Sequence, residues 1–147
     1  MADYKEVFKD LDLGCVLDVA TGAGAFLDEL LKDGKSYSTA LGIDIKEMAA
    51  DAFAGTFKDN DRVKFQLMDA KKLDFPDESF DTVSISFSLH HLESPAIPPA
   101  DLKRGLYPGG LLIVNEMYPD GNQTETQMTH TLMHHWFGRV DTANNVY

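Results

Sequence analysis

The chain has 147 residues, of which 44% are hydrophobic and 25% are charged, as is usual for one globular domain with a sizeable core. Twenty-four acidic residues against 13 basic ones give a net charge of −11, which argues against binding to duplex nucleic acid or to anionic membrane surfaces. One cysteine, Cys15, and the lack of an apolar run of about 20 residues predict a cytoplasmic protein without disulfides, a cysteine-based zinc site or a membrane span.

The first 13 residues are charged and lack a long apolar stretch, so no secretory signal is predicted. Beyond them, short apolar runs alternate with segments of helical periodicity. The predicted strands, in chain order, are 16–19, 37–43, 63–68, 80–87 and 110–116. The predicted helices are 24–32, 46–57, 100–106 and 123–137.

This alternation of apolar strands and helices predicts an α/β fold. We expect a Rossmann-like, doubly wound, mainly parallel sheet with helices on both faces, built as a single domain over residues 1–147. Ligands of such sheets bind beyond the carboxyl ends of the strands, where the strand order reverses. The residues that follow each strand are therefore the candidates for a functional site.

The loop after the first predicted strand contains Gly22 and Gly24. Residues without a Cβ allow a tight turn and let a ligand approach the backbone. The N–H groups of the following helix can receive a carboxylate or phosphate. On the glycines alone, a plain strand-to-helix turn is an open alternative. If Gly24 faces a ligand, valine there should block binding and leave the fold intact.

Asp44 ends the second predicted strand, 20 residues after Gly24. An acid at this spacing can accept hydrogen bonds from both hydroxyls of a ribose. The alternative is an N-cap for the helix predicted at 46–57. This arrangement is shared by nicotinamide-dependent dehydrogenases and adenosylmethionine-dependent methyltransferases.

Three residues favour the methyltransferases over the dehydrogenases. Asp18 stands before the glycine turn, where dinucleotide folds place an apolar residue, and Leu27 replaces their third glycine. Asp69 follows the third strand, where it could accept from an adenine amino group, and the Ala70 N–H could serve a ring nitrogen.

Four motifs stand in order along about 100 residues: VLDVATGAGAF at 16–26, LGIDI at 41–45, MDAKKLDFPDESFDTVSISFSLHHL at 68–92 and LYPGGLLIVNE at 106–116. With these motifs the chain resembles class I S-adenosylmethionine-dependent methyltransferases, close to the ubiquinone/menaquinone C-methyltransferase-like group. That family fold has seven strands, of which five are readable here.

The resemblance implies S-adenosyl-L-methionine as cofactor and a role for each matching residue. Asp18 and the loop backbone would face its methionine part, and Asp44 its ribose. Ile45 would pack on an adenine face. Ala20 replaces a glycine found in many members, a change that a small Cβ should tolerate. The expected cofactor-binding residues are Asp18, Ala20, Thr21, Gly22, Gly24, Asp44, Ile45, Asp69, Ala70, Ser86 and Phe87.

The reaction implied by the resemblance is an in-line transfer of the sulfonium methyl to a small-molecule acceptor. Orientation of the two partners can contribute up to ~7–11 kcal/mol to such a step. Where the acceptor needs a base, His90 and His91 are the candidate catalytic residues, because histidine titrates near neutral pH. The alternative is that both histidines have a structural role in the segment after the strand.

His130 and His134 lie four residues apart on the last predicted helix, a spacing found among metal ligands. No third ligand is visible and the glutamate of a zinc-protease motif is absent, so we predict no metal site. The helix is instead expected to be amphipathic, packing on the sheet or lining an acceptor pocket.

The sequence ends soon after the fifth predicted strand, so we expect a C-terminally incomplete domain that lacks the last two strands and turns over acceptor slowly or not at all. A non-catalytic cofactor-binding module or subunit is the alternative. A sheet that ends at the apolar residues 111–114 would expose an edge, which predicts a homodimer formed through that edge.

Overall fold

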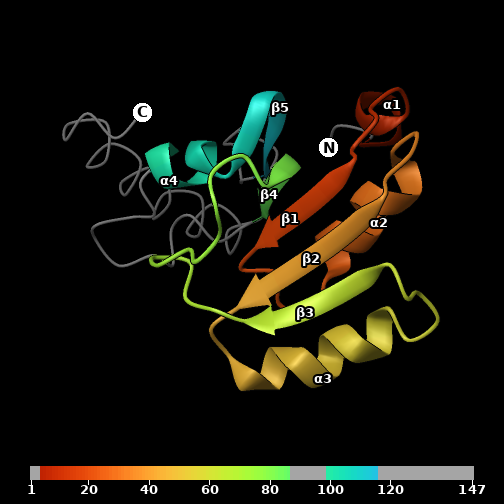
Figure 1. Ribbon diagram of the computed structural model, residues 1–147. Coiled ribbons are helices and arrows are strands. Elements are labelled where there is room, and N and C mark those ends of the chain that lie inside the picture. The colour runs from red at the N-terminus through yellow and green to blue at the C-terminus, as the bar shows by residue number, and fades with distance from the viewer. Residues whose placement is uncertain (1–3, 87–98, 116–147) are drawn as a thin grey trace, which may run out of the picture.

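The computed structural model describes residues 4–86 and 99–115, and in them one five-stranded sheet (Figure 1). Its strands, all parallel, are β1 (Cys15–Val19), β2 (Thr39–Asp44), β3 (Val63–Leu67), β4 (Phe80–Ser86) and β5 (Leu106–Asn115). The helices are α1 (Tyr4–Phe8), α2 (Ala25–Asp33), α3 (Glu47–Thr56) and α4 (Pro99–Arg104).

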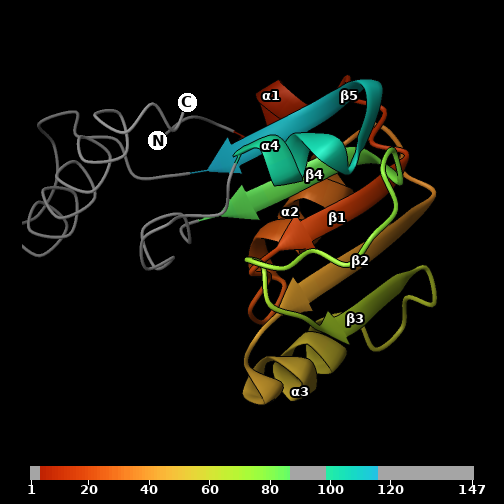
Figure 2. The same ribbon diagram turned by 60° about the vertical axis from the view of Figure 1, so that its left-hand side comes forward.

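The strand order is β3-β2-β1-β4-β5, so the chain moves outward from β1 and then returns to add β4 on the other side. The order reverses between β1 and β4, and the carboxyl ends of all five strands lie at one edge of the sheet (Figure 2). This confirms the predicted doubly wound, parallel α/β fold and places the expected ligand site at that edge.

Helices cover both faces of the sheet because β1, β2 and β4 are apolar on both sides. Alternate residues along β1 divide between two hydrophobic clusters, Val16 facing α2 and Leu17 facing the opposite layer. The first face packs against α1, α2 and α3. The second packs against α4 and the segment 68–79, and Figure 2 shows α4 and α2 on opposite sides.

The helix expected at 100–106 spans Pro99–Arg104, within two residues of the prediction, but the strand expected from residue 110 starts four residues earlier, at Leu106. The predicted strand began after Pro108 and Gly109, since both residue types are disfavoured in central strands. Among the described strands β5 is an edge strand, where a missing N–H is tolerated, and its register with β4 shifts after Phe80 pairs with Leu106.

The short helix α1 was not predicted, because its five residues are too few to show helical periodicity. Its Phe8 is nevertheless buried in the core and packs edge-to-face on Phe26, with 6.3 Å between the ring centroids. The remaining described boundaries agree with the predictions to within two residues, and the helix expected at 123–137 lies outside the described residues. In the part of the chain that the structure describes, no helix has the length and apolarity to cross a bilayer.

Candidate functional site

The loop that follows β1 reverses the chain through an unusual series of backbone conformations. Ala20, Gly22 and Gly24 have φ angles of 54°, 55° and 79°, all in the left-handed region. Alanine rarely adopts this region, at a cost of roughly 1–2 kcal/mol, so Ala20 is held there by its surroundings. The Thr21 N–H donates to the Ile43 carbonyl at 2.9 Å, which ties the loop to the end of β2.

The two glycines of the loop serve different purposes. A Cβ on Gly22 would meet no atom within 4 Å, so this backbone borders open space that a ligand can enter. A Cβ on Gly24 would come within 2.5 Å of the Phe57 ring and 3.0 Å of the Phe53 ring. The expectation that a side chain at Gly24 would meet a ligand was therefore wrong, because the missing side chain makes room for the aromatic core beneath the loop.

Asp44 joins the end of β2 to this loop. Its Oδ2 accepts the Gly22 N–H and its Oδ1 accepts the Lys46 N–H, each at 2.9 Å. The N-cap of α3 is Lys46, so the alternative of Asp44 as that cap was wrong. A carboxylate has about four acceptor positions, which leaves roughly two on this half-buried group for hydroxyls of a ligand.

Asp18 is buried at 2% exposure in the middle of the sheet. Its Oδ1 accepts the Ser84 hydroxyl and its Oδ2 accepts the Thr21 hydroxyl, both at 2.6 Å. Burial raises the pKa of Asp18 to about 6, and the two hydrogen bonds limit the rise. The carboxyl is thus charged above neutral pH and holds the side chain of the loop residue Thr21.

Ser84 is a site residue that sequence reasoning missed. It is fully buried in β4, opposite Asp18 in the register of β1 and β4. The available signal was the alternation of Thr82, Ser84 and Ser86 with apolar residues in a strand that the topology buries. A polar side chain at such a position needs a hydrogen-bond partner.

The next strand ends in the expected pair Asp69 and Ala70. Asp69 is exposed and its Oδ1 accepts the Lys71 N–H at 2.9 Å, whereas Ala70 is buried. The Met68 N–H donates to the Asp44 carbonyl at 2.9 Å. This bond holds the segment after β3 beside Asp44, so the second and third predicted acids are brought to one edge.

Exposed apolar side chains surround Asp44 on this edge. Ile45 is 62% exposed, Met48 in the first turn of α3 is 86% exposed, and Leu67, which pairs with Asp44 across the strands, is 50% exposed. Only Ile45 was expected from the sequence. Exposed large apolar groups close to one another are typical of a binding surface.

The carboxyl ends of β4 and β5 meet at a polar pair. Ser86 and Asn115 are register partners, and the Asn115 amide donates to the Ser86 hydroxyl at 2.9 Å. The expected site residues Phe87, His90 and His91 lie outside the described residues, as do His130 and His134.

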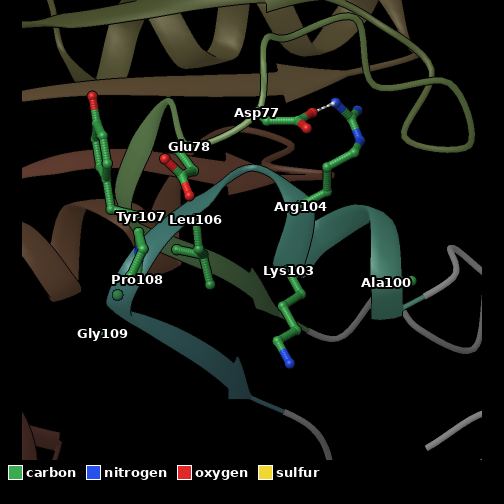
Figure 3. Close-up of a pocket in the computed structure, with 10 residues that line it drawn as sticks. Asp77, Glu78, Ala100, Lys103, Arg104, Leu106, Tyr107, Pro108 and Gly109 are labelled. Carbon is green, nitrogen blue, oxygen red and sulfur yellow. Dashed lines mark hydrogen bonds and ion pairs between the residues drawn. The ribbon is translucent and has the colours of Figure 1, made fainter.

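A pocket of about 530 Å³ lies at the opposite end of the sheet, against the starts of β4 and β5 (Figure 3). In it Arg104 contacts Asp77 at 2.7 Å and also donates to the carbonyls of Phe75 and Leu73. None of the predicted site residues lines this pocket. Arg104 instead fastens the end of α4 to the segment that continues from Ala70.

Residues 17–114 match the methyltransferase domain family, so the chain belongs to that family. It is 36% identical over 123 residues to demethylmenaquinone methyltransferase of Renibacterium salmoninarum, covering 80% of this chain and 48% of that protein. It is 29% identical over 107 residues to the ubiquinone/menaquinone biosynthesis C-methyltransferase of Geobacter sulfurreducens, covering 70% and 41%. The chain therefore spans somewhat under half the length of these relatives.

Solved structures agree with this assignment. A SAM-dependent methyltransferase from Aquifex aeolicus is 25% identical and superimposes with a TM-score of 0.61 over 88% of this chain and 73% of that one. The fold and family are those of class I S-adenosylmethionine-dependent methyltransferases, as the four sequence motifs predicted. They imply S-adenosyl-L-methionine as the cofactor.

The described residues fit that cofactor on three independent counts. The backbone at Gly22 borders open space, as a cradle for the methionine part requires. Asp44 retains acceptor positions for ribose hydroxyls beyond the two backbone N–H groups that it binds. Ile45, Met48 and Leu67 offer an uncovered apolar surface for an adenine ring.

Proposed function

We propose that the chain is the cofactor-binding part of an S-adenosyl-L-methionine-dependent methyltransferase that acts on a small-molecule acceptor. The observation that carries the proposal is Asp44, whose carboxylate links the loop after β1 to the end of β2 beside an exposed apolar surface. We assign it the ribose hydroxyls of the cofactor, since a carboxylate accepts both through charge-assisted hydrogen bonds.

We assign the other parts of the cofactor to the remaining site residues by their positions in the fold. The loop Ala20–Gly24, held by Asp18 and Asp44, receives the methionine part; the exposed apolar groups and Asp69 receive the adenine. When bound, S-adenosyl-L-methionine supplies an electrophilic methyl group on its sulfonium. We assign Ser86, at the end of β4, and Phe87, the next residue in the sequence, to cofactor binding near the sulfonium and the acceptor.

For the acceptor we propose a quinone precursor of the kind named in the relatives, demethylmenaquinone or a ubiquinone intermediate. His90 or His91 would take the proton where the acceptor must lose one, because histidine titrates near neutral pH. We place the protein in the cytoplasm, in keeping with its one free cysteine and acidic surface.

Replacing Asp44 by alanine tests the proposal. The change leaves two ribose hydroxyls without their charged acceptor, a loss of ~1.5–3 kcal/mol per hydrogen bond, so affinity for S-adenosyl-L-homocysteine should fall at least about tenfold. Titration calorimetry measures this affinity in the variant and in the wild type. The matched control is Asp12→Ala, which removes an exposed acid before β1, at the other end of the sheet, and should leave the affinity unchanged. Equal affinity of a folded Asp44→Ala variant and the wild type would refute the ribose assignment.

We also propose that this chain forms a homodimer through β5. Among the described strands β5 pairs only with β4, and its Leu112 and Val114 are 44% and 48% exposed. An apolar edge of this kind is a template for pairing with another chain. Light scattering over a concentration series should show association of the wild type and a monomer for Val114→Lys. Gln66→Lys, on the opposite edge strand β3, is the control and should associate like the wild type.

A further inference from the structure

The hydroxyl of Ser84 has no part in the proposed function so far, although it is hydrogen-bonded to the buried carboxyl group of Asp18. It is fully buried in β4, and its Oγ is 2.6 Å from Oδ1 of Asp18. The other Asp18 oxygen accepts the Thr21 hydroxyl at the same distance. A chain of two short hydrogen bonds thus runs from the middle of β4 through Asp18 to the loop after β1.

No cation among the described residues lies against the Asp18 carboxyl group to neutralise it. Its register partners are Gly42 on β2 and Ser84 on β4, and α2 packs on β1 with Leu27 and Leu30. The acids on the neighbouring strands are engaged elsewhere. Asp44 accepts the N–H groups of Gly22 and Lys46. Asp81 lies at the far end of β4, where it accepts the Cys15 N–H.

Burying a charge without a counter-ion is costly unless hydrogen bonds stabilise it. Only Ser84 and Thr21 do so among the described residues, and Thr21 belongs to the loop that Asp18 must hold. The Ser84 hydroxyl is therefore the donor that orients the carboxylate from the fixed side of the sheet.

We propose that Ser84 is a positioning residue for cofactor binding: its hydroxyl keeps Asp18 ionised and turned toward Thr21, and so holds the loop 20–24 in its binding conformation. The proposal rests on the proposed function of that loop. It assigns to Ser84 control of the pH range over which the cofactor binds.

The expected consequence has a definite sign. A protonated Asp18 accepts fewer hydrogen bonds, so it holds Thr21 less well and cofactor affinity should decline as the pH falls through the pKa of about 6. Removal of the Ser84 hydroxyl takes away a bond that favours the charged form, and the decline should move to higher pH. A hydrogen bond to a carboxylate changes such an equilibrium about tenfold, which corresponds to roughly one pH unit.

Ser84→Ala and Thr82→Val are a matched pair for the test. Thr82 is equally buried on the same face of β4, but its hydroxyl donates to the Leu13 carbonyl at 2.7 Å and not to Asp18. Both variants lose one buried hydroxyl. Affinity for S-adenosyl-L-homocysteine is measured by calorimetry from pH 5 to 8.5, and the Asp18 carboxyl is titrated by NMR in the ligand-free proteins.

In Ser84→Ala, the NMR titration of Asp18 and the decline in affinity should both move up by about one pH unit, with binding near pH 6 several-fold weaker. Thr82→Val should shift neither, and Ser84→Thr, which keeps a hydroxyl, should restore the wild-type profile. Should Ser84→Ala fail to fold, Ser84→Cys keeps the volume with a weaker donor and should shift both curves the same way.

Unchanged curves in Ser84→Ala, or equal shifts in Thr82→Val, would overturn the role of Ser84. A wild type that binds no S-adenosyl-L-homocysteine at any pH would instead refute the proposed function, whatever the NMR titration shows. The two failures are therefore distinguishable.

Discussion

Valine in place of Gly24 should unfold much of the protein, with a loss of roughly 2–5 kcal/mol in the free energy of unfolding. An added Cβ would lie 2.5 Å from the Phe57 ring, and Phe53 beside it is equally buried, so the core cannot yield cheaply. Overpacking of this kind costs ~1–3 kcal/mol, and a left-handed φ of 79° adds roughly 1–2 kcal/mol. Urea denaturation followed by circular dichroism measures the loss.

Gly22→Val is the matched variant for this prediction. Gly22 has a comparable φ of 55°, but open space where its Cβ would lie, so only the backbone strain should appear. This variant should stay folded and lose affinity for the cofactor, since the valine would occupy the space beside the loop. Equal stability of the two variants would show that the Phe53–Phe57 contact does not decide the need for glycine at position 24.

Asparagine in place of Asp18 should make the protein more stable at pH 8 and impair cofactor binding. Burial raises the pKa of Asp18 from 3.8 to about 6, so the folded state binds this proton more tightly than the unfolded state does. The charged side chain therefore costs stability above that range, by up to about 3 kcal/mol at ~1.4 kcal/mol per pKa unit. Asparagine keeps the shape and removes the charge.

The pH dependence of this effect follows from the sign of the shift. Between about pH 4 and 6 the folded protein holds the Asp18 proton and the unfolded chain does not, so stability from this group falls as the pH rises. The advantage of Asp18→Asn over the wild type should grow through that window and level off above about pH 7. Urea denaturation from pH 4.5 to 8 measures it, with Asp12→Asn as an exposed control. A difference independent of pH would contradict the prediction.

Both predictions concern groups that support the loop after β1 at a cost to the stability of the fold. The missing side chain of Gly24 makes room for the core, and the buried Asp18 of β1 is expected to lower the stability of the fold at neutral pH. A structure keeps a strained or destabilising group where the surroundings hold it and function uses it. The proposed binding of a cofactor at this loop supplies that use.

The sequence by itself determined the layers of the fold and the edge at which the candidate residues gather. Apolar residues on both sides of β1 and β4 require cover on both faces, so a parallel sheet between helices was predictable from a local pattern. Since parallel strands end at one edge, the loop after β1, Asp44 and Asp69 could be brought together without knowledge of any distance.

Only the tertiary structure decided which way each of these groups faces. Ser84 and Asp18 are 66 residues apart, and their hydrogen bond depends on the register of β1 with β4, which no local pattern encodes. The role of Gly24 depends on rings of α3 that a later crossover places beneath it. The early start of β5 shows only in its pairing with β4, which begins at Leu106 opposite Phe80, before Pro108. In each case the deciding contact joins elements distant in sequence, and its energy exists only once the sheet has formed.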